Sequence, residues 1–231
     1  MNDSPEVSTR RSTVEEWTRA LAESTGSPGG GAGTGLMLAV AASLISMVAG
    51  YTDADECDRV EVDAIRRRGQ SLRETALRLA DDDASASQAF GAAFRLERGP
   101  EREEAIREAS LNAAKASAVL GDLALGALDP LAWLASNGNP ALVSDVVVAF
   151  GALRAAISGA RTNVSFDLAS LRSGGKRLDE VREQHGDLWS AVKRFDEALD
   201  RIDTLTAGID HRAAPTDAAD QRDDMGTESS L

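Results

Sequence analysis

The chain has 231 residues, of which 42% are hydrophobic but only 4% aromatic, and a formal net charge of −13. Abundant Ala, Leu, Arg, Asp and Glu with few β-branched runs predict an all-helical protein. The acidic balance argues against nonspecific nucleic-acid binding, which needs Lys and Arg against phosphates. Cys57 is the only cysteine and there are two histidines, so no disulfide and no zinc-like ligand spacing exist within the chain. We therefore expect no protein-bound metal and no triad chemistry.

No linker rich in Pro, Gly or Ser separates two periodic blocks, so we expect one helical domain over residues 12–208. The polar residues 1–11 and the acidic residues 209–231 are predicted to be disordered tails, because their composition cannot bury apolar surface. Ser12 and Thr13 are each followed by Glu three residues later. This spacing predicts capping boxes for a first helix that ends near Gly26.

No charged residue occurs between Glu23 and Asp53. The sequence SPGGG predicts a glycine turn, and a buried helix follows it. Gly31, Gly35, Ala39 and Ser43 recur at spacing four, which lets another helix approach closely. A transmembrane span is the rival interpretation. No Lys/Arg cluster flanks the segment and several Gly, Ser and Thr dilute its hydrophobicity, so we expect a cytoplasmic protein that does not bind a membrane. The run also begins too late for a secretory signal.

Asp53 to Arg98 is predicted to form one long helix with an apolar seam. The seam consists of Ile65, Leu72, Leu79 and Ala86. At about 100° per residue, Asp83 falls on this seam and Asp81 on the opposite side. Asp83 could be a structural carboxylate satisfied by Ser87 or by an arginine from elsewhere. Alternatively, burial would raise its pKa, as a group that transfers protons near neutral pH requires.

The second half of the chain predicts four further helices. Gly99 and Pro100 precede a helix over residues 101–127, and Asp129-Pro130 and Asn137-Gly138 bound a short connecting helix. A mostly apolar helix then runs from Pro140 to Leu171, and a helix with a heptad seam that includes His185 covers residues 176–205.

The few polar residues of the helix over 140–171 fall on two faces. Arg154 and Arg161 share one face at spacing seven and are expected to pair with acids of another helix. Asn163 and Asp167 share another face at spacing four.

The segments SPGGGAGTG, DDDASAS and GNPALVSDVVVAFGALRAAISGARTNVSFDL together resemble the cyclodeaminase/cyclohydrolase family. This domain occurs alone in bacteria and at the C-terminal end of formiminotransferase-cyclodeaminase. The resemblance spans roughly residues 12–205. It implies a homodimeric bundle of long antiparallel helices that acts on a tetrahydrofolate derivative as substrate and holds no permanent cofactor. Cyclohydrolases open the 5,10-methenyl form to 10-formyltetrahydrofolate, whereas cyclodeaminases close the 5-formimino form and release ammonia.

The resemblance also implies roles for particular residues. Asp83 matches the family's Asp-Ala position and is the expected catalytic residue. The expected substrate-binding residues are Pro28, Gly29, Gly30, Gly31, Asn139, Ser144, Asp145 and Asn163. Ala32, Ser87 and Ser117 depart from the family's Ser, Phe and Pro. The leading expectation is a methenyltetrahydrofolate cyclohydrolase. A formiminotetrahydrofolate cyclodeaminase and a noncatalytic folate-binding or structural helical dimer are the alternatives.

Overall fold

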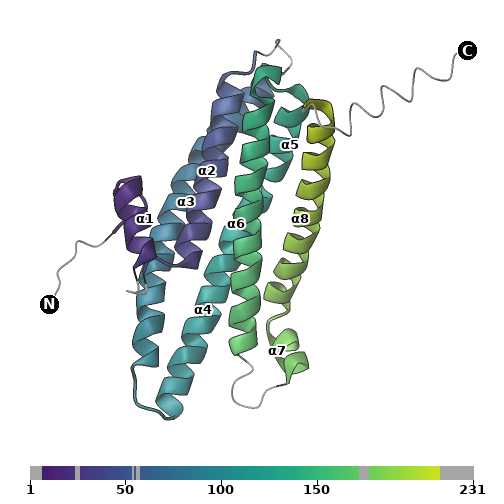
Figure 1. Cartoon of the computed structure of the whole chain (residues 1–231). Coiled ribbons are helices and arrows are strands. Elements are labelled where there is room, and N and C mark those ends of the chain that lie inside the picture. The colour runs from purple at the N-terminus through teal and green to yellow at the C-terminus, as the bar shows by residue number, and fades with distance from the viewer. Residues whose placement is uncertain (1–6, 24–26, 54, 56–57, 172–176, 214–231) are drawn as a thin grey trace, which may run out of the picture.

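The computed structural model describes residues 7–23, 27–53, 55, 58–171 and 177–213, and within these ranges it contains no strand. The elements are α1 Val14–Ala22, α2 Gly30–Gly50, α3 Arg59–Phe94, α4 Pro100–Leu125, α5 Leu128–Asn137, the 3-10 turn η1 Pro140–Leu142, α6 Val143–Ser170, α7 Leu178–Gln184 and α8 Gly186–Ala213. The predicted all-helical fold with long antiparallel helices is confirmed (Figure 1).

The uncharged helix α2 packs chiefly against α3 and α6, and α6 also packs against α4 and α8. In Figure 1 these long helices lie side by side, with α1 outside the bundle and α5 near its upper end. The largest fully buried side chains come mainly from the three helices α2, α6 and α8. They include Leu38, Ile45, Phe150, Leu153, Ile157 and Phe195. The core therefore runs along the bundle axis, as the apolar character of α2 and α6 predicts.

Small residues allow α2 and α3 to approach closely. A Cβ added at Gly35 would lie 2.8 Å from the Cβ of Ala80 and 3.1 Å from the carbonyl oxygen of Ala76. The predicted close packing along the glycine row is thus confirmed. The expected glycine turn is shorter than predicted, because α2 already begins at Gly30 and Gly29 is its N-terminal cap.

Helix α3 is shorter at both ends than predicted, and its seam is covered along only part of its length. Ile65 is fully buried and Leu79 partly buried, but Ala86 is exposed, so its predicted burial is wrong. The reason is the position of α2. It begins at Gly30, and Gly31 lies against Asp83. Beyond Asp83, α3 continues without α2 beside it.

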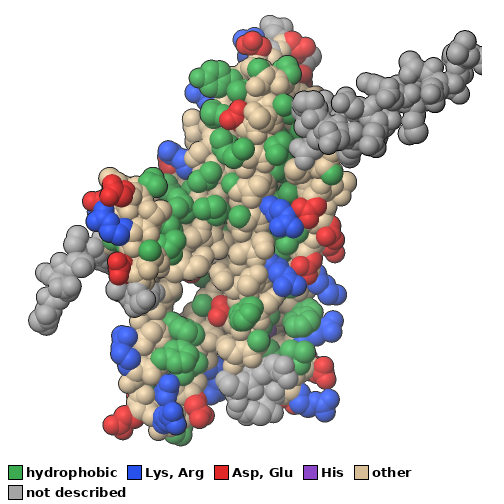
Figure 2. Space-filling view, in the orientation of Figure 1, with side chains coloured by type: hydrophobic (Ala, Val, Ile, Leu, Met, Phe, Trp, Pro, Cys, Tyr) green, Lys and Arg blue, Asp and Glu red, His purple; other side chains and the backbone are tan. Residues whose placement is uncertain are grey.

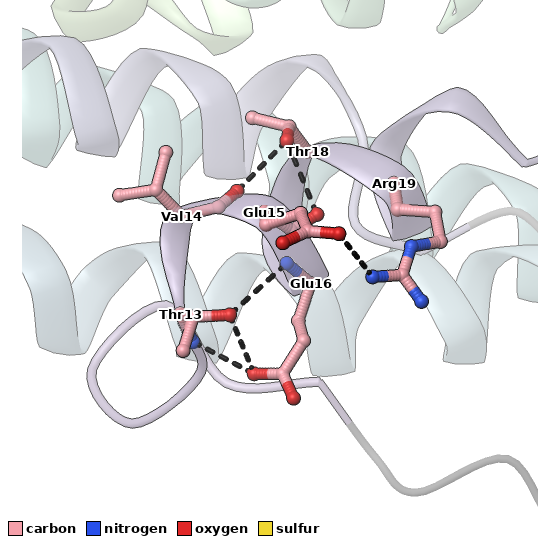
Figure 3. A network of polar contacts seen from close by, with 6 residues as sticks. All are labelled: Thr13, Val14, Glu15, Glu16, Thr18 and Arg19. Atoms are coloured by element: carbon pink, nitrogen blue, oxygen red, sulfur yellow. Dashed lines mark hydrogen bonds and ion pairs between the residues drawn. The ribbon is translucent and has the colours of Figure 1, made fainter.

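The capping box at the start of α1 is confirmed (Figure 3). The Thr13 hydroxyl accepts a hydrogen bond from the Glu16 backbone N–H at 3.2 Å, and the Glu16 carboxylate accepts one from the Thr13 N–H at 2.8 Å. An Arg19–Glu15 ion pair at 3.0 Å adds a contact on the exposed side. The described helix ends at Ala22, and the predicted end at Gly26 lies outside the described residues.

The last residues of the predicted N-terminal tail contact the bundle. The Ser8 hydroxyl donates to a carboxylate oxygen of Asp81 at 2.9 Å, and the Thr9 backbone N–H donates to the other. The Thr9 hydroxyl accepts from the indole N–H of Trp17 at 3.0 Å. The prediction that residues 7–11 are disordered is therefore wrong. The side of α3 opposite the seam, where Asp81 lies, does not face solvent alone but binds Ser8 and Thr9. We call residues 7–12 the N-terminal strap.

Deletion of residues 1–11 is expected to lower stability. It removes two hydrogen bonds to the Asp81 carboxylate, and it uncovers Trp17, which is 4% exposed and packs against Val7. Hydrogen bonds to a charged group contribute roughly 1.5–3 kcal/mol each, less when partly exposed, so a loss of about 2 kcal/mol is expected. Thermal melting of the truncated chain measures it, and Asp81→Asn should lose part of the same amount. An unchanged melting temperature in both variants would mean that the strap does not dock.

Two ion pairs join α6 to α8. The Arg154 Nε lies 2.6 Å from an Asp203 carboxylate oxygen, and the Arg161 Nε lies 2.9 Å from one of Asp196. The predicted pairing of these arginines with acids of another helix is confirmed. Hydrogen bonding to Asp203 raises the pKa of Arg154, and the same bond lowers the pKa of Asp203.

The C-terminal helix differs from its prediction at both ends. The expected single helix over residues 176–205 is divided at His185, which ends α7 and precedes α8. Helix α8 continues to Ala213, and Ile209 is 1% exposed in the core. The predicted boundary at residue 208 is therefore too early, because an apolar residue of the presumed tail completes the packing. Residues 214–231 lie outside the described part.

By length and composition alone, three described segments could cross a bilayer: Gly30–Gly50, Pro100–Asn137 and Pro140–Ser170. Within the bundle, 56%, 44% and 33% of their most apolar windows are buried. The apolar surface of α2 thus serves in large part to pack against neighbouring helices.

Candidate active site

A small cavity of about 70 Å³ lies where four helices meet. Its lining comes from α2, α3, α4 and α6 and consists of Gly31, Thr34, Leu79, Asp82, Asp83, Ala116, Ser117, Leu120 and Asn163. Three residues that the sequence analysis assigns to the site, namely Asp83, Gly31 and Asn163, are therefore brought together from three helices. Ser117, one of the departures from the family pattern, also lines the cavity.

Asp83 occupies the space that the glycine at position 31 leaves free. A Cβ on Gly31 would collide with the Asp83 carboxylate, so only glycine lets the acid lie against the start of α2. Its Oδ2 is buried and has no hydrogen-bond partner among the described residues, contrary to the structural interpretation in which Ser87 or an arginine satisfies it. Burial raises the pKa of Asp83, and a hydrogen bond from the Ala32 backbone offsets part of this effect.

A second carboxylate, Asp167, lies near Asp83, and the sequence analysis did not include it in the site. It is half-buried on α6, one turn after Asn163. Burial, together with the negative charge of Asp83, raises its pKa to about 6. The spacing of four from Asn163 was the available signal. Two neighbouring acids of raised pKa can divide the roles of proton donor and proton acceptor.

The other residues of the predicted glycine turn support the cavity from outside. Pro28 is buried, Gly29 caps α2, and Gly30 is its first residue. The Ser27 hydroxyl donates to the carbonyl oxygen of Ala84 at 3.1 Å, which ties this segment to α3 beside Asp83.

Asn139, Ser144 and Asp145 do not join the cavity. Asp145 and Asn163 are eighteen residues apart on α6, which corresponds to about 27 Å of helix. Asn139 is instead a structural cap. Its side chain accepts from the Ala141 N–H at 3.0 Å and donates to the Tyr51 carbonyl oxygen at 2.9 Å. The structure therefore does not place these three predicted substrate-binding residues beside Asp83 within the chain.

The fold and the cavity define an all-helical domain with a partly buried carboxylate between its central helices, suited to proton transfer on a small substrate. The family described as formiminotransferase-cyclodeaminase matches residues 13–184, and the chain belongs to this family. Its members act in folate-linked one-carbon chemistry, either as cyclodeaminases or as cyclohydrolases.

Two known proteins illustrate the relationship. A methenyltetrahydrofolate cyclohydrolase from Methylorubrum extorquens is 29% identical over 183 residues, which cover 75% of this chain and 88% of the relative. The crystal structure of formiminotetrahydrofolate cyclodeaminase from Thermotoga maritima superposes with a TM-score of 0.72 at 22% identity, over 87% of this chain and 96% of the other. The second likeness shows the shared fold.

Proposed function

We propose that the protein is a cytoplasmic 5,10-methenyltetrahydrofolate cyclohydrolase that forms 10-formyltetrahydrofolate without a permanent cofactor. The observation that carries the proposal is the buried, unbonded Oδ2 of Asp83 in a cavity walled by four helices. The similarity to a relative named as a cyclohydrolase favours this reaction. The family description and the structural likeness make formiminotetrahydrofolate cyclodeaminase the second candidate.

The substrate is a cation whose methenyl carbon bridges two nitrogens, and an ionised Asp83 would stabilise its charge. Asp83 accepts a proton from the attacking water as the oxygen bonds to the methenyl carbon. It then returns this proton to N5 as the bond between the carbon and N5 breaks. The remaining hydroxyl proton leaves as the formyl carbonyl forms, and Asp167, with its pKa near 6, accepts it. The net reaction consumes water and releases one proton.

The near-ultraviolet absorbance of the methenyl form distinguishes the candidate reactions. With purified protein, loss of this absorbance from methenyltetrahydrofolate indicates hydrolysis. Its appearance from 5-formiminotetrahydrofolate, with release of ammonia, indicates cyclodeamination. Folate binding without either change would support a noncatalytic binding protein, and absence of binding would support a structural helical dimer.

Asp167→Asn is expected to stabilise the protein only at higher pH. The pKa of Asp167 rises from 3.8 to about 6 on folding, so the folded state holds the proton more tightly. The contribution of Asp167 to the free energy of unfolding is therefore largest below about pH 4 and is lost as the pH rises through 6. Asn has no charge, so it removes the destabilisation that the ionised Asp167 causes at higher pH. After discounting for the side chain's partial exposure, a gain of about 1 kcal/mol is expected at pH 8 and none at pH 4. Urea denaturation at both values measures it, and an equal effect at both would contradict the assignment.

We also propose that the chain forms a homodimer through the face shared by α2 and α6. Helix α2 has no charged residue, yet Met37 and Val40 are 37% and 39% exposed, and Val148 of α6 is 59% exposed. Figure 2 shows hydrophobic and uncharged atoms across this middle part of the molecule.

Sedimentation should give about twice the chain mass of 24.3 kDa. Val40→Glu should shift the protein to monomer, because it places a charge in the apolar contact. A monomeric wild type at micromolar concentration would contradict the proposal.

A further inference from the structure

The α3–α4 hairpin extends past the cavity, where α2 no longer covers it. Helix α2 begins at Gly30, level with Asp83, whereas α3 continues to Phe94 and α4 begins at Pro100. In Figure 1 the hairpin and the end of α6 both reach below α2. Figure 2 shows hydrophobic side chains over both of these lower parts. A face that is buried higher in the bundle is therefore open below Asp83.

Two aromatic side chains lie on this open face. Phe90 and Phe94 follow Asp83 by seven and eleven residues, so at about 100° per residue all three point to the same side of α3. The two rings lie with centroids 5.0 Å apart. Phe94 remains 46% exposed. A pair of aromatic rings of which one is partly buried and one exposed, on the helix that carries Asp83, is a suitable surface for a flat aromatic ligand.

Arg102 stands at the far end of the same face. It lies eighteen residues, or five full turns, before Leu120, so both side chains leave α4 in the same direction, and Leu120 lines the cavity. The guanidinium carbon of Arg102 lies 5.8 Å from the centre of the Phe94 ring. Its Nε is buried and has no hydrogen-bond partner among the described residues. Among these residues, no carboxylate lies within ion-pair distance of it.

The structural interpretation is that Arg102 simply packs on Phe94. Such packing accounts for the ring contact, but it leaves a buried donor of a charged group without an acceptor, which is costly. A carboxylate that enters the open face would supply the acceptor. Phe94 lies eleven residues beyond Asp83, about 16 Å along the helix. An elongated ligand can therefore reach both ends.

We propose that this face binds the p-aminobenzoyl-glutamate part of the folate substrate, with the aromatic ring against Phe90 and Phe94 and a glutamate carboxylate on Arg102. The identity of the ligand rests on the proposed function. In reduced folates the one-carbon bridge, the aminobenzoyl ring and the glutamate follow one another in this order. Along the hairpin, the acid, the two rings and the cation follow in the same order.

Arg102→Leu tests the proposal with two substrates, methenyltetrahydrofolate and the carboxamide of methenyltetrahydropteroate, which has neither the glutamate nor any other carboxylate. For the first, KM should rise about tenfold or more while kcat stays within about twofold, because an ionic hydrogen bond to a distant part of the substrate is lost. For the second, KM should not change. Arg102→Lys should retain part of the preference for the glutamate. An equal rise for both substrates, or no rise for either, would overturn the proposal.

Arg107→Leu is the matched control. Arg107 lies on the same helix, is half-buried and pairs with Glu104 at 2.9 Å. Its direction from α4 differs from that of Arg102 by about 140°, so its replacement should leave both KM values unchanged. Thermal melting of each variant confirms that the bundle is folded before the kinetic values are compared.

Calorimetric titration with p-aminobenzoylglutamate and with p-aminobenzamide separates this inference from the proposed reaction. If p-aminobenzoylglutamate binds to the wild type and Arg102→Leu abolishes this binding, the proposed binding face is supported even when no folate is turned over. In the opposite case, the wild type turns over the folate while Arg102→Leu changes neither KM nor the binding of the fragment. That result would refute the proposed binding face and leave the cyclohydrolase proposal intact.

Discussion

Asp83→Asn is expected to reduce turnover of methenyltetrahydrofolate by about a hundredfold to ten-thousandfold, the range for loss of a general acid or base. The amide keeps the size of the carboxylate and one acceptor oxygen, but it cannot exchange a proton. Because Asp83 has a buried oxygen without a partner and its pKa is raised by burial, removing its charge should not unfold the bundle. Steady-state kinetics and thermal melting of the same preparation separate catalysis from folding.

Asp63→Asn is the control for this experiment, since Asp63 is an exposed acid of the same helix. Asp81 is unsuitable, although it is closer in sequence, because it accepts hydrogen bonds from the N-terminal strap. Near-normal activity of a folded Asp83→Asn protein would rule out the proposed role. Equal losses in both variants would indicate a general effect of charge on α3.

Gly35→Leu is expected to destabilise the fold by several kcal/mol. Even a single Cβ at this position would lie 2.8 Å from the Cβ of Ala80 and 3.1 Å from the backbone oxygen of Ala76. Overpacking typically costs about 1–3 kcal/mol, occasionally more. Here the neighbours include rigid backbone, and a whole leucine side chain must be accommodated. Urea denaturation measures the loss.

Gly33→Ala, in the same helix, is expected to raise the stability of the protein instead of lowering it. No atom lies within 4 Å of the Cβ that this change adds, so the higher helix propensity of alanine should stabilise the protein by roughly 0.5–1 kcal/mol. Similar effects at positions 33 and 35 would show that α2 does not pack against α3 through its glycine row.

Local sequence signals predicted much of the fold and one of the two neighbouring acids, Asp83. The Thr13 capping box, the break at Gly99 and the close packing at Gly35 all depend on short-range chemistry that the sequence displays. The helical phase of Asp83 likewise follows from its neighbours. Helical spacing places Asp167 on the same face as Asn163, but its proximity to Asp83 depends on how α6 is oriented in the bundle, which the sequence does not display.

The wrong predictions concern contacts between distant segments. Ala86 has an apolar periodicity, but whether it is buried depends on where α2 begins. The tail residues Ser8 and Thr9 have a polar composition typical of disorder, yet Asp81 provides acceptors for both. Asn139 matches a family motif, and the structure uses it to cap η1 and to join the end of α2. Composition and periodicity do not describe such pairings.

The contact between Gly31 and the Asp83 carboxylate constrains how this domain can change. A side chain at position 31 would enter the volume of the acid itself, whereas position 33 opens onto free space. A mutational library screened for folding alone could therefore retain variants at position 31 that push the carboxylate aside. If Asp83 acts as proposed, a library screened for turnover should lose them. The proposed function therefore requires glycine at position 31, because the Asp83 carboxylate occupies the space that a side chain there would take.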